Sequence, residues 1–433
     1  MQKQPIINIG MIGHVANGKS SLTECLTGIR TQKFGAEKER NITIRLGYAN
    51  AKIWKCPQCP DPECYSSTDS TKNYSSCEEC NSDMKLVSHI SIVDCPGHNM
   101  LTSTMMNGSS VMNYTLLVES ASNQSIPAPQ TTEHLQATQL SQIPNIMVCM
   151  NKIDIVKKDD ALMKINQLRD HLLDKHNLDS PIIPISATFK ANLDLVCKIL
   201  GELPIPHNNV DDLMEMICIR SFDINKPGTN VTELKGGVIG GSIKTGKLNI
   251  GDHIVIYPGN YSMRTDGCGF QYQPLHTQVL SIHSDKNEIM EAIPGGLLGV
   301  QTTLDPAHTK NDLMTGSLIV TKNINEKDEK DMTDIKVYDK IILNMDTLLV
   351  DDPKEKMAKN KKIKINFNSN NIDCEVYRYS VSKNELKLIL NKPIAINSKR
   401  INYVTVMSEE RTDNIIGRGV IIDGEECLLN LIY

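Results

Sequence analysis

Between residues 5 and 205, short apolar runs alternate with stretches of helical periodicity. The runs are INIGMIG, ISIVD, YTLLVES, NIMVCM and PIIPIS, and each is followed by a helical pattern such as SLTECLTG or ALMKINQLRDHLLDKH. Strands that alternate with helices in this way favour a mostly parallel sheet with helices on both faces. We therefore predict an α/β domain over residues 1–206.

The pattern changes after ELPIPH, a Pro-punctuated linker at 202–207. Beyond it, β-branched runs are divided by glycine turns, as in KGGVIGGSIKTGKLNIGD (235–252) and PGGLLGV (294–300). Short strands with Gly turns are typical of antiparallel sheets. The sequence predicts an antiparallel β-barrel over residues 207–325.

A charged segment, NINEKDEKDMTD (323–334), separates this region from a third one. The third region contains the runs IKINF, CEVYRYSV, LKLIL, YVTVM and GVIIDG, which again look like short strands. We predict a second antiparallel barrel over residues 326–433.

Composition limits the kind of protein and its partners. The 433 residues exceed the size at which single cores usually stop growing, and the 40% hydrophobic and 22% charged content fits a globular protein. The net charge of -5 confines any nucleic-acid contact to a local basic patch. No apolar run approaches the roughly 20 residues that span a bilayer, so we expect a cytoplasmic protein without a membrane partner.

The stretch GHVANGKSS follows the first apolar run and precedes a helical pattern. Gly13 to Ser20 satisfy G-x-x-x-x-G-K-[ST], whose backbone N–H groups converge on phosphates. Lys19 can reach the β and γ phosphates, and the Ser20 hydroxyl can bind Mg²⁺. The candidate phosphate-binding residues are Gly13, Ala16, Asn17, Gly18, Lys19, Ser20 and Ser21.

The base is selected by NKID at 151–154, directly after the apolar strand IMVCM. The acceptor-only carboxylate of Asp154 can take both the N1–H and the 2-amino group of guanine, which adenine cannot offer together. Asn151 can bond the base edge, and the stem of Lys152 can cover the ring. Ser186, Ala187 and Thr188, which follow the strand PIIPI, can offer a backbone N–H to guanine O6. These residues predict GTP and GDP, rather than ATP, as ligands.

DCPGH, residues 94–98, follows the strand ISIV. Asp94 can hold Mg²⁺ through water, Gly97 can bring its N–H to a γ phosphate, and His98 can orient the attacking water. Thr43, in RNITI, is the remaining magnesium candidate. A histidine beside Pro-Gly is more often a turn residue, so the catalytic role of His98 depends on the neighbouring motifs.

Five of the thirteen cysteines lie between residues 56 and 80. Cys56-x₂-Cys59 and Cys77-x₂-Cys80 are separated by 17 residues, the spacing of a four-thiolate zinc knuckle. We predict a closed, structural zinc site in an insertion at about 55–81. The alternative is a set of reduced surface cysteines without metal, since Cys64 is a spare thiol in the same loop.

A basic run, KEKMAKNKKIK (354–364), can meet tRNA or ribosomal phosphates. Such a run is also typical of a solvated loop, and Glu355 and the preceding Asp351-Asp352 dilute its field.

These motifs carry a family resemblance over nearly the whole chain. They are GHVANGKS, ERNITIRLGYANAKIWKC, VDCPGHNML, MNKID, PIIPISA, RSFDINKPG and LKGGVIGGSI. The chain resembles the gamma subunit of eukaryotic and archaeal translation initiation factor 2, within the elongation factor Tu superfamily. The resemblance implies one GTPase domain and two β-barrels that carry methionylated initiator tRNA to the small ribosomal subunit and release it after GTP hydrolysis. It also implies alpha and beta companion subunits, a GTPase-activating protein and a nucleotide exchange factor.

Two residues depart from the superfamily pattern. Elongation factor Tu has an acidic residue at the position of Ala16, whereas the gamma subunit resembles this chain there. At the position of Asn17, the gamma subunit usually has histidine. Because Ala16 removes a carboxylate beside the phosphates, we expect slow hydrolysis without an activating partner. The alternatives are a GTP-coupled metabolic enzyme such as a nucleotide-activating sulfurylase subunit, a carrier of another aminoacyl-tRNA, and a nucleotide-locked assembly scaffold.

Overall fold

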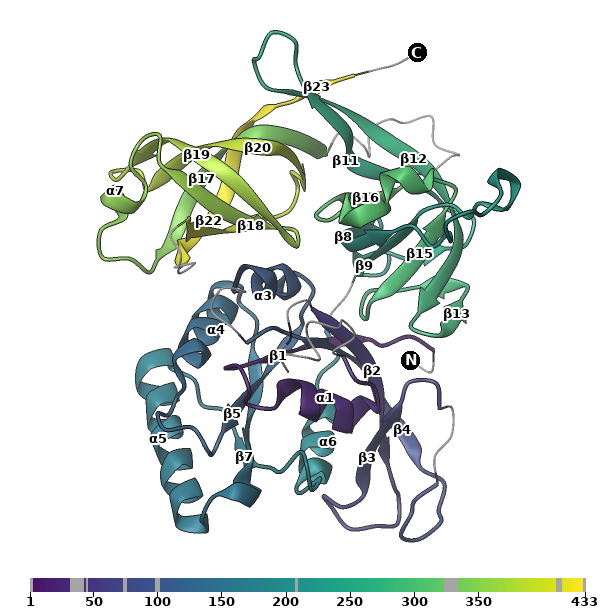
Figure 1. Ribbon diagram of the computed structural model, residues 1–433, viewed down its shortest axis with the longest axis vertical. Helices are drawn as coiled ribbons and strands as arrows, with labels where there is room; N and C mark the ends of the chain where they lie inside the picture. The colour runs from purple at the N-terminus through teal and green to yellow at the C-terminus, as the bar shows by residue number, and fades with distance from the viewer. Residues whose placement is uncertain are drawn as a thin grey trace. The chain divides into compact units, whose positions relative to one another are not determined.

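The computed structural model describes residues 3–31, 43, 46–72, 76–97, 102–206, 209–322, 334–409 and 415–430. The chain forms two compact units. One comprises Met1–His207 with Ser284–Asn287 and Gly295–Leu297, and the other comprises Asn208–His283, Glu288–Pro294 and Leu298–Tyr433. Figure 1 shows the elements of each unit.

A seven-stranded sheet with the order β3-β2-β4-β1-β5-β6-β7 forms the centre of the first unit. Its strands are β1 (Ile7–Ile12), β2 (Gly47–Lys55), β3 (Tyr65–Asp69), β4 (Lys85–Asp94), β5 (Tyr114–Ser120), β6 (Asn145–Asn151) and β7 (Ile182–Pro184). The four pairings from β4 to β7 are parallel, whereas β2 is antiparallel to both β3 and β4. The prediction of a mostly parallel sheet is confirmed.

Helices cover both faces of this sheet (Figure 1). They are α1 (Lys19–Thr27), α3 (Thr102–Ser109), α4 (Pro129–Leu140), α5 (Lys158–His176) and α6 (Leu193–Gly201). On one face, Ile12, Leu117 and Val148 of the strands cluster with Leu135 of α4 and Leu168 of α5. Helices α1 and α6 pack against β2, β3 and β4.

The hairpin of β2 and β3 was not predicted as a pair of strands. β3 reads YSSTD, which has no apolar alternation, and β2 carries Asn50 and Lys52 among its buried residues. Lys52 is fully buried, and its Nζ donates a hydrogen bond of 2.6 Å to the Lys72 carbonyl. Strands with polar residues at buried positions give no binary pattern that sequence reasoning can read.

A closed barrel of six strands, in the order β11-β16-β8-β9-β15-β12, opens the second unit. Its strands are β8 (Glu215–Phe222), β9 (Val238–Thr245), β11 (His253–Met263), β12 (Phe270–Ser284), β15 (Leu298–Thr302) and β16 (Leu318–Thr321). Three short strands add to it: β10 (Leu248–Asn249) pairs β14 (Glu291–Ala292), and β13 (Asn287–Ile289) follows β12. Met216, Ile254 and Val300 belong to its core.

The glycines of the stretch 235–252 serve two purposes, as turn residues and as residues within a strand. Gly240 and Gly241 lie inside β9, opposite Arg220 and Cys218 of β8. The chain has left-handed φ instead at Gly246, after β9, where φ is 71°. A Cβ at Gly241 would lie 2.1 Å from the Ile217 carbonyl oxygen, so the neighbouring backbone selects glycine there.

The second barrel closes in the order β17-β20-β19-β18-β21-β22. Its strands are β17 (Ile335–Leu348), β18 (Lys362–Phe367), β19 (Asn370–Ser380), β20 (Glu385–Asn397), β21 (Tyr403–Ser408) and β22 (Ile415–Glu426), with the short helix α7 (Pro353–Lys356) between β17 and β18. The five runs predicted as strands fall in β18 to β22. Two antiparallel barrels therefore follow the GTPase-like domain, as predicted.

The two barrels are joined within their unit. β23 (Leu428–Leu429) pairs in parallel with Gln271 and Tyr272 of β12. Val255 and Leu318 share an apolar cluster with Val337. The boundaries predicted at 206/207 and 325/326 stay predictions, because residues 207–208 and 323–333 lie outside the described residues.

No helix in the described ranges has the length and apolar character needed to cross a membrane.

Candidate functional site

The loop between β1 and α1 has the shape that a phosphate-binding loop requires. Gly13 has φ 129°, and a Cβ there would lie 2.2 Å from the Val118 carbonyl oxygen, so no side chain fits. Ala16 is exposed and adopts φ 60°, and Gly18 precedes the first turn of α1. The N-terminus of α1 thus faces the end of the loop, where its free N–H groups favour an anion.

Lys19 folds back over this loop. Its Nζ donates hydrogen bonds of 2.8 Å to the Gly13 carbonyl and 2.9 Å to the His14 carbonyl. Burial lowers the pKa of Lys19 to about 8, and the charge of Asp94 opposes this shift. An ammonium group that is desolvated and close to the loop is placed to interact strongly with a phosphate.

Two of the predicted magnesium ligands lie side by side. Ser20 Oγ and Thr43 Oγ1 are 2.9 Å apart, although residues 41–42 and 44–45 lie outside the described residues. Asp94 is fully buried at the end of β4, and its Oδ2 accepts a hydrogen bond of 2.6 Å from the Thr31 hydroxyl. Hydroxyl and carboxylate oxygens are hard ligands that suit Mg²⁺.

The DCPGH motif approaches the phosphate loop through Gly97. A Cβ at Gly97 would lie 2.4 Å from Lys19 Nζ and 2.7 Å from the Val15 backbone nitrogen, so only glycine permits this contact. The predicted catalytic residue His98 lies outside the described residues.

The predicted base-binding residues meet at the end of β6. Asn151 Nδ2 donates a hydrogen bond of 2.9 Å to the Asn17 carbonyl, and Asn151 Oδ1 accepts one of 3.1 Å from the Ala187 N–H. Asn151 therefore connects the phosphate loop to the loop after β7. Lys152 has φ 64°, and Asp154 is exposed in the short 3-10 helix Ile153–Ile155.

The remaining predicted residues lie around these two loops. Ser186 is buried, and its Oγ accepts a hydrogen bond of 3.2 Å from the Phe189 N–H. Ser21, on the first turn of α1, and Thr188 are exposed. The side chain of Asn17 points away from solvent, so its contribution to nucleotide binding would come from its backbone.

A buried polar network supports the phosphate loop, and sequence reasoning missed all its members except Asn17. Asn17 Nδ2 donates to the Val118 carbonyl at 2.9 Å, while Asn17 Oδ1 accepts from Asn123 Nδ2 at 3.0 Å. Asn123 also donates to Glu119, which accepts a second hydrogen bond of 2.6 Å from the Thr131 hydroxyl. Burial raises the pKa of Glu119, and the hydrogen bond from Thr131 opposes this shift.

His134 is the second support that the sequence does not reveal. It lies fully buried on α4, and its Nδ1 accepts a hydrogen bond of 3.1 Å from the Gly13 N–H. Burial and the nearby charge of Lys19 lower the pKa of His134 to about 3, so the ring is neutral at pH 7. A neutral imidazole is required here, because only an unprotonated nitrogen can accept from Gly13.

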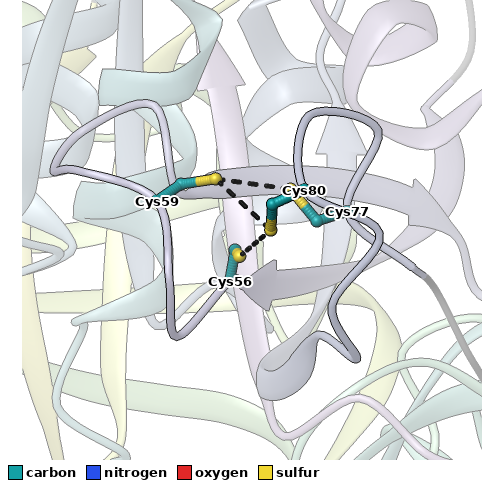
Figure 2. Close-up of side chains that lie close together, drawn as sticks. All are labelled: Cys56, Cys59, Cys77 and Cys80. Atoms are coloured by element: carbon teal, nitrogen blue, oxygen red, sulfur yellow. Dashed lines mark hydrogen bonds between the residues drawn. The ribbon is translucent and has the colours of Figure 1, made fainter.

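The predicted cysteine ligands form one cluster beside the loop that connects β2 to β3. Figure 2 shows the thiol groups of Cys56, Cys59, Cys77 and Cys80 turned towards one another from two loops. The sulfurs of Cys56 and Cys80 are 3.4 Å apart, those of Cys59 and Cys77 are 3.5 Å apart, and all four lie within 4.8 Å of one another. A tetrahedral zinc ion with bonds of about 2.3 Å requires sulfurs about 3.8 Å apart. The cluster therefore fits zinc.

Cys64 does not belong to the cluster. It is buried beside the hairpin, and its carbonyl accepts a hydrogen bond of 2.7 Å from the Cys56 N–H. The Gln58 N–H points at Cys56 Sγ at 3.4 Å, which favours a thiolate at that sulfur.

Comparison with known proteins covers nearly the whole chain. A model of the elongation factor Tu GTP-binding domain matches residues 4–220. The gamma subunit of eukaryotic translation initiation factor 2 from Schizosaccharomyces pombe is 44% identical over 326 residues, which are 74% of this chain and 73% of that protein. The gamma subunit of translation initiation factor 2 from Sulfurisphaera tokodaii is 37% identical over 430 residues, which are 97% of this chain and 99% of that protein.

Solved structures share the fold. The bacterial selenocysteine-specific elongation factor EF-Sec has a TM-score of 0.69 at 19% identity, and the match covers 97% of this chain but 59% of that longer protein. The elongation factor SelB of Methanococcus maripaludis, in complex with the GTP analogue GppNHp, has a TM-score of 0.66 at 21% identity, covering 98% of this chain and 80% of that protein.

The fold, the phosphate loop and the matching GTP-binding domain define a translational GTPase. Within this class, the chain belongs to the family of gamma subunits of translation initiation factor 2. The alternatives of a metabolic enzyme and an assembly scaffold are not favoured, because relatives that match 74% and 97% of this chain carry initiation-factor names.

Proposed function

We propose that this chain, in its GTP-bound state, carries methionylated initiator tRNA to the small ribosomal subunit and releases it after GTP hydrolysis. The match to the archaeal gamma subunit over 97% of the chain, both barrels included, supports this function. Companion alpha and beta subunits, a nucleotide exchange factor and a GTPase-activating protein are the proposed protein partners.

The nucleotide would be held by the three motifs that meet around the phosphate loop. The backbone from Gly13 to Ser20 and the Lys19 ammonium bind the phosphates, and Asn151, Lys152 and Asp154 bind guanine with the loop from Ser186 to Thr188. Ser20 and Thr43 would ligate Mg²⁺, with Asp94 joining through water. When bound, this ion neutralises charge on the phosphates.

The γ phosphate acts as a signal in this proposal. Lys19 Nζ occupies the space where a Cβ of residue 97 would lie, so Lys19 and Gly97 are in close contact, and Thr43 lies beside Ser20. A γ phosphate contacted by all three would order the segments that carry Gly97 and Thr43, and its loss would release both. A typical coupling of about 1–3 kcal/mol would change tRNA affinity roughly 5- to 150-fold.

Hydrolysis would be slow in the isolated chain. Ala16 supplies no carboxylate beside the phosphates, and we assign the orientation of the attacking water to His98. An arginine finger from an activating partner can raise such a rate by ~10³–10⁵. Single-turnover cleavage with and without activator and small subunits measures this, and His98→Ala should lose the acceleration while GTP binding persists. Fast GTP cleavage by the chain alone would contradict the expectation of slow intrinsic hydrolysis.

The deciding experiment couples base choice to tRNA binding. Filter binding of methionylated initiator tRNA is measured with GTP, GDP and xanthosine triphosphate, for the wild-type chain and for Asp154→Asn. We expect tRNA binding with GTP in the wild type and with xanthosine triphosphate in the variant, because an amide can meet the carbonyl that replaces the 2-amino donor. Equal tRNA retention with GTP and GDP would refute the proposed function. Equal competition by ATP would refute the assignment of Asp154.

A further inference from the structure

The second barrel carries two adjoining pockets that the nucleotide site does not use. The larger, of about 320 Å³, is lined by Lys354 and Lys359 before β18 and by Tyr377 and Arg378 of β19. The smaller, of about 150 Å³, lies at the turn from β19 to β20 and shares Arg378. The volume of the larger pocket lies within the usual range of about 300–1,000 Å³ for ligand sites.

Positive charge dominates both pockets. Their cations are Lys354, Lys359, Arg378, Lys383 and Lys387, and their one carboxylate is Glu385. Across the chain segments that the structure describes, none of these five cations forms a salt bridge. Other cations of this barrel are paired: Lys336 with Glu426, at 2.7 Å, is an example. Five cations against one carboxylate therefore give these two pockets a positive charge, although the chain as a whole has a net charge of -5.

The strand register shows that this cluster costs stability in the free protein. Arg378 of β19 lies directly opposite Lys387 of β20. Like charges at directly opposed positions destabilise an antiparallel pair. An anion bound between the two side chains would relieve the repulsion.

Tyr377 brings an aromatic face to the same place. It lies at the irregularity between Val376 and Arg378 in the register of β19 with β20. An irregularity of this kind re-aims a side chain, and here it lets the consecutive residues Tyr377 and Arg378 line one pocket. The Tyr377 side chain is 56% exposed, and Lys359 Nζ lies 6.0 Å from the centroid of its ring.

We propose that this surface, the Tyr377 pocket (Lys354, Lys359, Tyr377, Arg378, Lys383 and Lys387), binds single-stranded RNA. An unpaired base stacks on Tyr377, and the flanking phosphates contact the five cations. Cations spread over two pockets match a chain of phosphates rather than one anion, and an exposed ring among cations is the arrangement that single-stranded nucleic acid uses. Paired bases are not free to stack on a side chain, so a duplex would leave Tyr377 unused. The inference goes beyond the proposed function and does not need a bound nucleotide.

The test uses fluorescence anisotropy of a labelled polyuridylate of about 12 nucleotides, within the site sizes of single-strand binders. The full chain is compared with Tyr377→Ala, Tyr377→Phe and Arg378→Gln. Tyr377→Ala should weaken binding by about 5- to 150-fold, and Tyr377→Phe should bind like the wild type because stacking needs no hydroxyl. Arg378→Gln should reduce the slope of log affinity against log salt by about 0.7 for each phosphate that the variant no longer neutralises.

Lys247→Gln is the matched control for charge. Lys247 is exposed on the turn after β9 in the other barrel, so its loss should leave the polyuridylate affinity unchanged. Equal affinities of the wild type and Tyr377→Ala would overturn the proposal. A duplex RNA of the same length that binds as tightly as polyuridylate would also overturn it, and so would an acidic phosphopeptide that binds where polyuridylate does not.

The same variants separate this inference from tRNA carriage. If the wild type does not bind initiator tRNA with GTP, but Tyr377→Ala weakens polyuridylate binding as expected, the proposed function is rejected and the proposal for the Tyr377 pocket is retained. If tRNA carriage is normal and Tyr377→Ala leaves the polyuridylate affinity unchanged, the proposal of a single-stranded RNA site is rejected and the proposed function is retained. Loss of tRNA binding in Tyr377→Ala would identify the single-stranded RNA as part of the tRNA.

Discussion

At the scale of single residues, His134, which supports the phosphate loop, makes the free energy of unfolding depend on pH. Its pKa is about 3 in the folded chain and 6.5 in an unfolded one. Below pH 6.5 the unfolded chain binds a proton at His134 that the folded chain does not bind. The free energy of unfolding therefore falls as the pH falls towards 3, and the contribution is present in full above pH 6.5.

His134→Asn should remove this dependence. The amide oxygen can accept from Gly13 but does not titrate, so between pH 7 and pH 5 the variant should lose about 2 kcal/mol less stability than the wild type. Urea unfolding at both pH values measures the difference. His253→Asn, at an exposed position in β11, is the control and should follow the wild type. If His134→Asn also follows the wild type, the imidazole is not the buried neutral group described.

Sequence reasoning reached the residues whose chemistry is encoded by fixed spacing. Lys19 and Ser20 stand in one motif, and Asn151 follows a readable strand. His134 escaped because it lies 121 positions from Gly13, and its helical surroundings contain no motif. The contact exists only after α4 has packed beneath the phosphate loop, so no local pattern reports it.

At the scale of elements, the β2–β3 hairpin depends on the cysteine cluster beside the loop that connects its two strands. Cys56 follows β2 directly, and Cys77 and Cys80 lie in the loop that leads to β4. β3 offers few apolar side chains of its own, which makes the hairpin poor in burial. A metal that joins the two loops would supply the missing stabilisation.

The expected metal content is close to one zinc per freshly purified chain. Cys77→Ser should lose most of this zinc, because a tetrahedral site with three thiolates binds less tightly. Cys64→Ala should retain it, since Cys64 lies outside the cluster. Elemental analysis of unchelated protein decides the matter. Absence of zinc in the wild type, or equal zinc in both variants, would show that the cysteines are reduced thiols without a metal.

The strands that the sequence predicted are those with a readable apolar run, and the strand that it missed lacks one. Strands β5 and β6 were predicted from the continuous apolar runs at their centres, residues 116–118 and 147–150. β3 was not, because its Ser and Thr residues are held by pairing with β2 and by packing against α6. Gly241 lies within β9 for a related tertiary reason, since a Cβ there would lie 2.1 Å from the Ile217 carbonyl oxygen.

At the scale of the whole molecule, a partly buried ion pair links the two barrels of the second unit. Arg400 Nε lies 2.9 Å from Glu215 Oε1, and the Glu215 side chain is 6% exposed. Asn397 also donates to Glu215, and Arg400 donates to Thr245 at 3.0 Å. The contact joins the end of β20 to β8, which belong to different barrels.

Arg400→Ala should destabilise this junction by about 2–3 kcal/mol, because it leaves the Glu215 carboxylate buried without its cation. Lys399→Ala is the adjacent control: Lys399 is 70% exposed and pairs with Asp334, so its loss should cost about 0–1 kcal/mol. Hydrogen exchange of the β8 amides reports the local free energy of opening. Equal exchange in the two variants would mean that the ion pair does not hold the barrels together.

The parallel pairing of β23 with β12 has a consequence for the order of events during synthesis. The first barrel has all six of its strands once residue 321 has been made, whereas β23 ends 108 positions later, at residue 429. At about 5–20 residues per second, the ribosome needs roughly 5–20 s to add that length. During this interval the backbone groups of Gln271 and Tyr272 have no β23 partner, and an unpaired strand edge invites association with other chains. Until β23 has been made, the edge of β12 at Gln271 and Tyr272 is therefore a site where a chaperone would protect the nascent chain.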